Sequence, residues 1–390
     1  MDSILIKNVL HKDAKTNIFI EGDRIKAIGV PSDKNASQVI EADGKAILPA
    51  FYNTHTHAAM NLLRGYADDM PLQEWLTEWI WPFEDKMTAE DVEKGTALAA
   101  EEMIKGGTVF FNDMYFAPER IADVVARTGI RSAIGITVMD NHSLAEREVK
   151  AKFIRDWKDT TGRMMLTVAP HAIYTVGTER LKEAALQARE NGLKLHIHVS
   201  ETAQEVKDCI AAHGMTPVRY LDSIGFLGPD VIAAHCVHVD AEEWGILAER
   251  GVTVSHCPCS NMKLGSGRFP YELAIKSGVR ITLGTDGASS NNNLDMREEM
   301  KFAALLAKVD GDPSILPASM VFKWATENGA EAFGIDAGVI EEGKIADCIL
   351  LNLNDVQMRP LHNLISNWVY SAQSSSVDAV ICNGKLIYGK

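Results

Sequence analysis

Two histidines separated by one residue, His55 and His57, follow an apolar stretch and could bind a metal ion together. Alternate residues of a β-strand point to the same face, so a strand ending here would present both imidazoles side by side. Neutral imidazole is the commonest metal ligand in proteins. The short pattern also fits two hydrogen-bonded core histidines or an exposed loop start. The other residues capable of chemistry must therefore decide between these interpretations.

Further histidines and carboxylates follow other apolar runs. His171 follows one run, His198 and Glu201 close another, His235 ends a third and Asp286 follows the last. If the runs are parallel strands, their carboxyl ends meet at one rim and gather metal ligands and proton-transfer groups. An aspartate after a strand often caps a helix, so no single residue is decisive. The convergence as a whole favours a metal-dependent active site.

Other candidates for metal binding are interpreted as structural. His196 shares a strand face with His198 but lies one layer lower, which suits a core residue or one that supports a ligand. Cys257 and Cys259 lack the second pair that a structural zinc site needs. The six cysteines show no disulfide framework, so reduced thiols in a cytoplasmic protein are expected.

Strand-like and helix-like segments alternate through the middle of the chain and would position these residues. Eight apolar runs occupy residues 46–54, 108–112, 131–138, 164–169, 194–199, 231–237, 251–256 and 280–285. Thr88 to Asp91 resembles a capping box at a helix start, and Gly129 stands where a helix C-cap would precede a strand. Eight such units predict an α/β fold, a (β/α)8 barrel of the TIM type.

The two ends of the chain have a different pattern. Residues 1–50 read as short alternating strands, and residues 339–390 contain Asn383-Gly384, which is typical of a type I′ hairpin turn. Both ends are therefore predicted to form one small β-sandwich domain, with the catalytic barrel spanning residues 51–338.

The composition is that of a soluble globular protein and argues against some partners. The 390 residues are 46% hydrophobic, and the formal net charge is −14. So acidic a chain lacks the basic face of a nucleic-acid or anionic-membrane binder. No apolar run reaches the ~18 residues of a membrane span, and the N-terminal sequence does not resemble a signal peptide. A cytoplasmic protein with a small-molecule substrate is expected.

The chain resembles the amidohydrolase superfamily over nearly its whole length. PAFYNTHTH is similar to the strand-one His-x-His signature, HIHVSE to the strand-five motif and AAHCVH to the strand-six histidine segment. SHCPCSNMKLGSG and TLGTDGASSNN resemble the strand-seven and strand-eight motifs. Within the superfamily, NLLRGYADDMPLQEWLTEWIWPFE and APHAIYTV are similar to the methylthioadenosine and S-adenosylhomocysteine deaminases, neighbours of the triazine hydrolases and guanine deaminases.

The resemblance implies one divalent metal ion per subunit, expected to be zinc, with iron or manganese as alternatives. Its ligands would be His55, His57, His198 and Asp286. Superfamily branches with two metals use a carboxylated lysine at the end of strand four. His171 occupies that place here, so a mononuclear site is predicted. The resemblance also implies a homo-oligomer.

The reaction implied by the resemblance is hydrolytic deamination of an adenosine derivative, in which metal-bound hydroxide attacks C6 and ammonia leaves. Glu201 would move a proton from the water to the ring nitrogen. His235 and Asp286 would orient the hydroxide and stabilise the developing charge. The alternatives are a deaminase or hydrolase of another aminated ring (guanine, a pterin or a triazine) and a non-catalytic ligand-binding barrel. The presence of both Glu201 and His235 argues against the last.

Substrate contacts are also implied by the resemblance. Glu84 would accept hydrogen bonds from the two ribose hydroxyls, since a carboxylate offers two acceptor oxygens. His171 would contact the nucleoside or the leaving group, and Trp75 would cover the base or the 5′-substituent. The structural alternatives are a charged helix start for Glu84 and core packing for Trp75.

The sequence departs from relatives that prefer S-adenosylhomocysteine. Those relatives hold the amino-acid carboxylate with arginines near strand three, where this chain has Ile136 and Ser143 and only Arg147 nearby. Bidentate capture of a carboxylate requires a guanidinium. Methylthioadenosine, 5′-deoxyadenosine or adenosine is therefore the favoured substrate.

Overall fold

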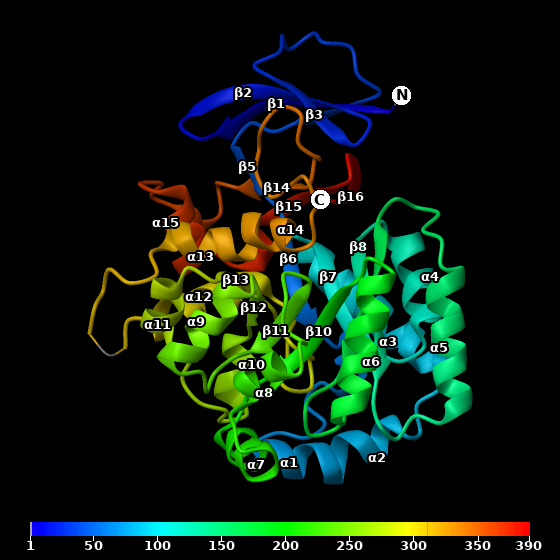
Figure 1. The fold of residues 1–390 in the computed structure, drawn as a ribbon. Coiled ribbons are helices and arrows are strands. Elements are labelled where there is room, and N and C mark those ends of the chain that lie inside the picture. Colours follow the sequence, from blue (N-terminus) through cyan, green and yellow to red (C-terminus); the bar gives the residue numbers. More distant parts are fainter. Residues whose placement is uncertain (1, 310) are drawn as a thin grey trace.

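The structure, a computed structural model, describes residues 2–309 and 311–390 and contains two sheets (Figure 1). The larger is a barrel of parallel strands in sequential order: β6 (Phe51–Thr56), β7 (Thr108–Tyr115), β8 (Arg131–Val138), β9 (Met164–Pro170), β10 (Lys194–Val199), β11 (Val231–His235), β12 (Thr253–His256) and β13 (Arg280–Leu283). The first and last strands nearly close it. The Asp286 N–H donates to the His55 carbonyl at 3.0 Å, and the Thr54 hydroxyl donates to the Leu283 carbonyl at 2.9 Å.

Helices surround the barrel and alternate with its strands (Figure 1). They are α3 (Ala89–Lys105), α4 (Pro118–Thr128), α5 (Leu144–Asp156), α6 (Thr178–Glu190), α7 (Ala203–His213), α8 (Pro217–Ser223), α9 (Ala241–Glu249), α10 (Pro258–Lys263), α11 (Tyr271–Ser277), α12 (Met296–Leu306), α13 (Ala318–Ala325) and α14 (Glu327–Ala332). The predicted capping box of Thr88 and Asp91 begins α3, and Gly129 ends α4 with φ of +83°. The predicted (β/α)8 fold is confirmed.

Both termini build the second sheet, which lies at one end of the barrel (Figure 1). Its strands are β1 (Ser3–His11), β2 (Ala14–Glu21), β3 (Arg24–Ile28), β4 (Gln38–Glu41), β5 (Lys45–Pro49), β14 (Cys348–Asn352), β15 (Val377–Cys382) and β16 (Lys385–Gly389). Asn383 and Gly384 have φ of 51° and 73°, as a type I′ turn between β15 and β16 requires. A small β domain formed from both ends is thus confirmed, as one mixed sheet.

The segment predicted as a single strand at residues 46–54 is two strands in different sheets. β5 pairs antiparallel with β14, whereas β6 pairs parallel with β7. The change occurs at Ala50, whose N–H donates to the Asp347 carbonyl at 3.2 Å, while the Phe51 N–H donates to the Gly107 carbonyl at 2.9 Å. The apolar run hides this break because both strands are buried.

A long excursion after β6 lies across the end of the barrel opposite the terminal sheet (Figure 1). It contains a 3-10 helix η1 (Ala58–Leu63), α1 (Leu72–Glu74), a π-helical segment η2 (Trp75–Ile80) and α2 (Trp81–Glu84). The excursion therefore covers the carboxyl ends of the barrel strands, where the predicted site residues lie.

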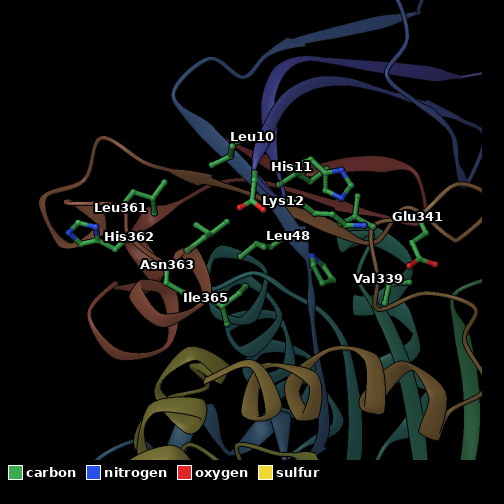
Figure 2. A pocket seen from close by; sticks show the side chains of 15 residues that line it. Leu10, His11, Lys12, Leu48, Val339, Glu341, Leu361, His362, Asn363 and Ile365 are labelled. Atoms are coloured by element: carbon green, nitrogen blue, oxygen red, sulfur yellow. The ribbon is translucent and has the colours of Figure 1, made fainter. Parts of the chain in front are cut away.

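A cavity of about 620 Å³ opens elsewhere, between the terminal sheet and α15 (Leu364–Tyr370), as Figure 2 shows. His11, Leu48, Glu341 and Ile365 are among its lining residues, and within the described chain none of the predicted site residues lines it. No helix among the described residues is long and apolar enough to cross a bilayer.

Candidate active site

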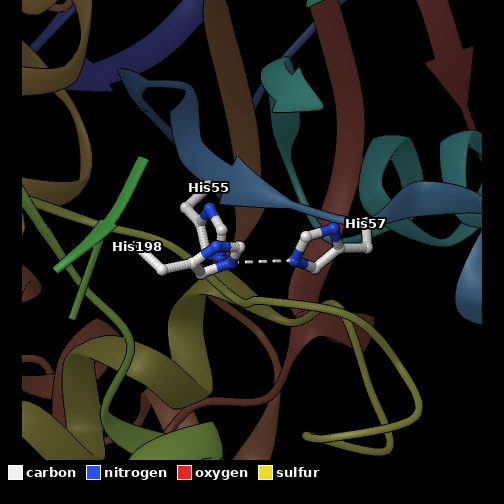
Figure 3. A group of neighbouring side chains, drawn as sticks. All are labelled: His55, His57 and His198. Carbon is white, nitrogen blue, oxygen red and sulfur yellow. Dashed lines mark hydrogen bonds between the residues drawn. The ribbon is translucent and has the colours of Figure 1, made fainter. Parts of the chain in front are cut away.

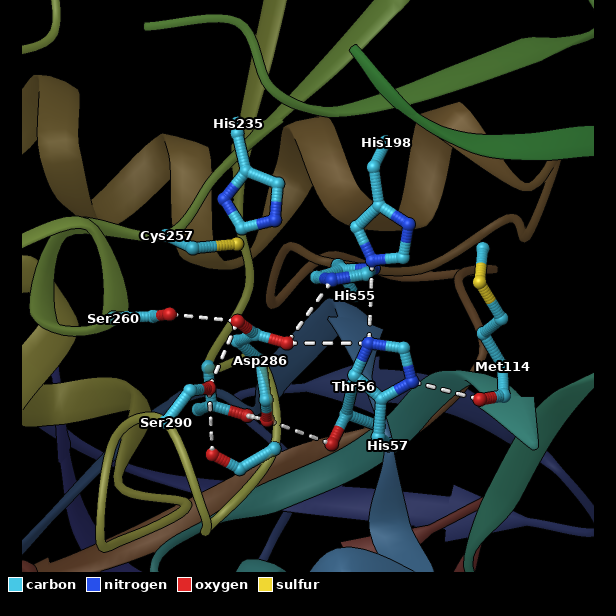
Figure 4. Close-up of polar contacts among 12 residues, drawn as sticks. His55, Thr56, His57, Met114, His198, His235, Cys257, Ser260, Asp286 and Ser290 are labelled. Atoms are coloured by element: carbon cyan, nitrogen blue, oxygen red, sulfur yellow. Dashed lines mark hydrogen bonds and ion pairs between the residues drawn. The ribbon is translucent and has the colours of Figure 1, made fainter. Parts of the chain in front are cut away.

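Four of the predicted metal-site residues converge at the carboxyl ends of three strands. His55 lies at the end of β6 and His57 directly follows that strand, His198 lies on β10, and Asp286 lies three residues after the end of β13 (Figures 3 and 4). The ligand atoms of His55, His57 and His198 lie within 4.8 Å of one another, as do those of His55, His235 and Asp286. Sequence positions more than 200 residues apart are thus brought to one point by the parallel strand order.

The spacing of these ligand atoms suits a single ion. Asp286 Oδ1 lies 3.3 Å from His55 Nε2 and 3.3 Å from His57 Nε2. His57 Nε2 is also 3.3 Å from His198 Nε2 (Figure 3). Ligands about 2.0–2.1 Å from a tetrahedral zinc ion are about 3.3–3.4 Å apart. The separations therefore match those of ligands that share one cation.

The outward ring nitrogens of two histidines are bound to backbone carbonyls. His57 Nδ1 donates to the Met114 carbonyl at 2.7 Å, and His198 Nδ1 donates to the His171 carbonyl at 2.6 Å. A carbonyl oxygen can only accept, so Nδ1 carries a proton and Nε2 is the nitrogen that faces the cluster. This is the tautomer that binds a metal through Nε2.

His55 has a different partner. Its Nδ1 lies 2.8 Å from Nε2 of His196, the residue expected from the sequence to support the site from a lower layer. Its Nε2 is buried and has no hydrogen-bond partner among the described residues. Asp286 Oδ1 lies 3.3 Å from this nitrogen, but a buried nitrogen that makes no hydrogen bond is costly, and a cation at the cluster would satisfy it. The side chains present therefore fit a divalent metal ion.

Asp286 provides the negative charge of the cluster. Burial would raise the pKa of its carboxyl group, but His55 and His57 outweigh this and hold it well below its usual range. Its Oδ2 accepts hydrogen bonds from the hydroxyls of Ser260 (2.6 Å) and Ser290 (2.9 Å), which leaves Oδ1 facing the histidines (Figure 4). Burial lowers the pKa of His57, yet Asp286 raises it overall to about 9. Either a proton on His57 or a bound divalent cation can therefore balance the negative charge of Asp286.

Glu201 is a buried carboxylic acid beside this cluster. Its Oε1 accepts from the Ser266 hydroxyl at 3.1 Å, and its Oε2 lies 3.8 Å from His235 Nε2. Glu205 fixes its backbone by accepting from the Glu201 N–H at 2.7 Å. Burial raises the pKa of Glu201, which brings it closer to neutral pH, where a group can both accept and return a proton.

The three predicted substrate residues have different surroundings. His171 follows β9, its ring lies 4.8 Å from that of His198, and burial lowers its pKa to about 3. Glu84 ends α2, and its Oε1 accepts from the Tyr115 hydroxyl at 2.6 Å. Trp75 is 4% exposed within the hydrophobic core, and its indole N–H donates to the Ala67 carbonyl at 3.2 Å. Trp75 is therefore packed in the core, as the structural alternative expected. A contact between Trp75 and the substrate stays a prediction.

Sequence reasoning missed several residues that hold the site. They are Ser260 and Ser290, whose hydroxyls donate to Asp286, together with Glu205, which bonds the Glu201 N–H, and Tyr115, which bonds Glu84. Tyr115 is the last residue of β7. A polar residue at a strand end was the pattern that identified the site histidines, so the sequence also contained the signal for Tyr115. The role of Glu205, within α7, depends on how the helix packs and left no pattern in the sequence.

Residues 46–387 match the amidohydrolase family, and the chain belongs to this family. It is 48% identical to 5-methylthioadenosine/S-adenosylhomocysteine deaminase 1 of Archaeoglobus fulgidus, across 98% of this chain and 93% of that protein. It is 45% identical to the 5′-deoxyadenosine deaminase of Methanothermobacter thermautotrophicus, across 99% and 93% of the two chains.

Solved structures agree on the fold. A zinc-bound adenosine deaminase from Xanthomonas campestris superimposes with a TM-score of 0.93 at 35% identity, covering 99% of this chain and 92% of that one. A triazine hydrolase from Arthrobacter aurescens has a TM-score of 0.91 at 22% identity, covering 100% and 95%. The second likeness concerns the fold alone.

Proposed function

We propose that this protein is a metal-dependent deaminase that converts a 5′-substituted adenosine and water to the inosine analogue and ammonia. The observation that carries the proposal is the convergence of His55, His57, His198 and Asp286 beside the buried acid Glu201. The near-full-length identity of 45–48% to deaminases of 5′-modified adenosines supports the choice of substrate.

The metal ligands are proposed to be the three histidines and Asp286, and the metal to be zinc. The ligand spacing of 3.3 Å supports this, as does the zinc bound to the Xanthomonas neighbour. A bound zinc ion would supply Lewis-acid activation of a water molecule. A cytoplasmic location and homo-oligomeric assembly stay predictions from the sequence.

Proton transfer is assigned to Glu201. It accepts a proton from the attacking water and delivers it to the ring nitrogen of the adenine. The remaining proton of the added hydroxyl then passes to the amino group, the C6–N bond breaks and ammonia leaves. His235 is proposed to orient the reacting oxygen through Nε2, since its Nδ1 is held 2.8 Å from Asn261 Oδ1. His171 remains neutral at physiological pH because burial lowers its pKa to about 3, so it contacts the substrate as an uncharged imidazole.

The region near strand three favours substrates without a carboxylate tail. Ile136 is buried, and the Ser143 hydroxyl caps α5. The guanidinium of Arg147 donates to the carbonyls of His142 (2.9 Å) and Asp140 (3.3 Å), so it stabilises a loop. No bidentate carboxylate site is expected there, which supports methylthioadenosine, 5′-deoxyadenosine or adenosine over S-adenosylhomocysteine.

The test is a substrate panel with zinc-loaded protein, following ammonia release and the adenine-to-hypoxanthine absorbance change together. Methylthioadenosine and 5′-deoxyadenosine should be deaminated, and S-adenosylhomocysteine more slowly. Faster turnover of S-adenosylhomocysteine would contradict the substrate preference. Ammonia release only from guanine, a pterin or a triazine would replace the nucleoside assignment by the alternative ring deaminase.

A further inference from the structure

A basic cavity lies outside the barrel, between α5 and α6. Its volume is about 230 Å³, and four basic side chains line it: His142, Arg147, Lys150 and Arg180. Glu183 is the one acidic residue that lines it in the described part of the chain. The whole protein carries a net charge of −14, so this local excess of positive charge stands against the general trend of the molecule.

Lys150 lines the basic cavity with an ammonium group that has no carboxylate partner. Its Nζ donates to the Thr137 carbonyl at 2.9 Å, to the Thr137 hydroxyl at 3.1 Å and to His142 Nδ1 at 3.1 Å. Among the described residues no carboxylate forms an ion pair with it. Burial lowers the pKa of Lys150 to about 8. A bound anion would restore the stability of the charged form.

Arg180 and His142 offer further donors. Arg180 Nη1 donates to Glu183 Oε2 at 2.9 Å, but its buried Nε has no hydrogen-bond partner within the described chain. Burial, together with the charge of Lys150, lowers the pKa of His142 to about 4, so its imidazole is neutral. Its Nδ1 accepts from the Met139 N–H at 3.2 Å, which places the ring proton on Nε2.

The nearby carboxylates already have other partners. Glu146 accepts from the Ser143 N–H and hydroxyl, both at 2.7 Å, in the capping box of α5. Asp140 accepts from a backbone N–H in the loop after β9 at 2.9 Å. The Glu183 side chain is 64% exposed, so solvent weakens its interaction with the cations. Lys150 is therefore left without a direct counter-ion.

The basic cavity is on the helical side of β8. The Thr137 hydroxyl accepts from Lys150 of α5, so this side chain faces the helices. Alternate residues of a strand point to opposite faces, and the adjacent side chains of Ile136 and Val138 are buried. None of the residues proposed to bind the metal or to contact the substrate lines the cavity. The strand therefore separates a ligand in the basic cavity from the proposed metal site.

We propose that the basic cavity binds a phosphate group, either inorganic phosphate or a phosphate monoester. The donors come from α5, from α6 and from the loop after β8, which suits a tetrahedral anion with several acceptor oxygens. Phosphate would give Lys150 its counter-charge and Arg180 Nε an acceptor. A cavity of this volume has ample room for such a group. This binding site goes beyond the proposed deamination and takes no part in its chemistry.

The test measures binding of inorganic phosphate to the zinc-loaded protein by isothermal titration calorimetry, in chloride buffer without substrate. Phosphate should bind, and glycerol 3-phosphate, a monoester without a base, should compete with it. The tighter of the two identifies the source of the phosphate group. Lys150→Met removes the charge and keeps an unbranched side chain, and Arg180→Gln removes the guanidinium. Each variant should bind phosphate about tenfold more weakly, because each loses a hydrogen bond to a charged group.

Lys152→Met is the matched control. Lys152 lies on the same helix, its side chain is 72% exposed, and it pairs with Asp156, so its loss should leave the affinity for phosphate unchanged. Melting temperatures provide a second measurement. In phosphate-free buffer Lys150→Met should melt no lower than the unmodified protein, because it removes a buried charge without a counter-ion. Phosphate should raise the melting temperature of the unmodified protein more than that of Lys150→Met.

Three outcomes would overturn the proposal. The first is no binding of phosphate or glycerol 3-phosphate at millimolar concentration. The second is equal phosphate affinity in Lys150→Met, Arg180→Gln and Lys152→Met. The third is competition between phosphate and methylthioadenosine that is the same in Lys150→Met, which would place the anion inside the barrel. Failure of the proposed deaminase reaction would leave the calorimetric result unchanged, since the titration contains no substrate.

Discussion

Individual residues in the site are proposed either to bind the metal ion or to transfer protons. Glu201 is proposed to transfer protons and not to bind the metal, because its Oε1 accepts a hydrogen bond from Ser266 and its Oε2 faces His235. Its burial raises its pKa, as expected of a group that exchanges a proton near neutral pH.

Glu201→Gln should therefore abolish proton transfer while keeping the shape of the side chain. A fall in kcat of about 10²- to 10⁴-fold is expected, with zinc content per subunit unchanged. Steady-state kinetics and metal analysis of the same preparation measure both quantities. Ser266→Ala, which leaves the carboxylate in place, is the control and should lose far less activity. Near-normal turnover in Glu201→Gln would remove Glu201 from the mechanism.

Helices α10 and α12 are joined by a buried acid that lies behind the site. Glu299 of α12 accepts from the Cys259 N–H at 3.2 Å and from Asn291 Nδ2 at 2.6 Å. Burial raises the pKa of Glu299 to about 8. Since Cys259 precedes Ser260, whose hydroxyl bonds Asp286, this contact helps to set the position of α10.

The pH dependence of the protein's stability should reflect the titration of Glu299. Its pKa in the folded state exceeds the value of about 4.5 expected in the unfolded chain. Its protonation therefore stabilises the fold below pH ~4.5, and this contribution is lost as the pH rises towards 8. Glu299→Gln cannot ionise, so its melting temperature should fall less than that of the unmodified protein between pH 6 and about 9. Parallel melting curves across this range would contradict the assignment.

At the level of the whole molecule, one buried carboxylate connects the barrel to the terminal sheet. Asp347 Oδ2 accepts from the Tyr52 hydroxyl of β6 at 2.5 Å and lies 3.4 Å from Arg131 Nη2 of β8. Its Oδ1 accepts from the Asn383 N–H in the turn between β15 and β16 at 2.5 Å. The carboxylate thus bonds to both sheets.

Asp347→Ala should destabilise the whole protein, because it leaves the buried Arg131 guanidinium without its carboxylate partner. A loss of about 3–5 kcal/mol is expected for breaking a buried ion pair from one side, seen as a much lower denaturation midpoint. Asp336→Ala, which removes an exposed partner of Arg24 and Lys344, is the control and should change stability little. Equal midpoints for the two variants would show that the buried contact is not needed.

The sequence alone determined the barrel, the terminal β domain and the residues at the strand ends. Strand periodicity and helix caps are local properties, and parallel strand order alone brings His55, His198 and Asp286 to one rim. Only the tertiary structure decided where the chain crosses from β5 to β6, since a continuous apolar run does not reveal which sheet provides the hydrogen bonds. It also decided which side chains hold the reacting groups. The pairing of Tyr115 with Glu84 depends on how a short helix outside the barrel packs against β7, and such long-range packing leaves no periodic pattern in the sequence.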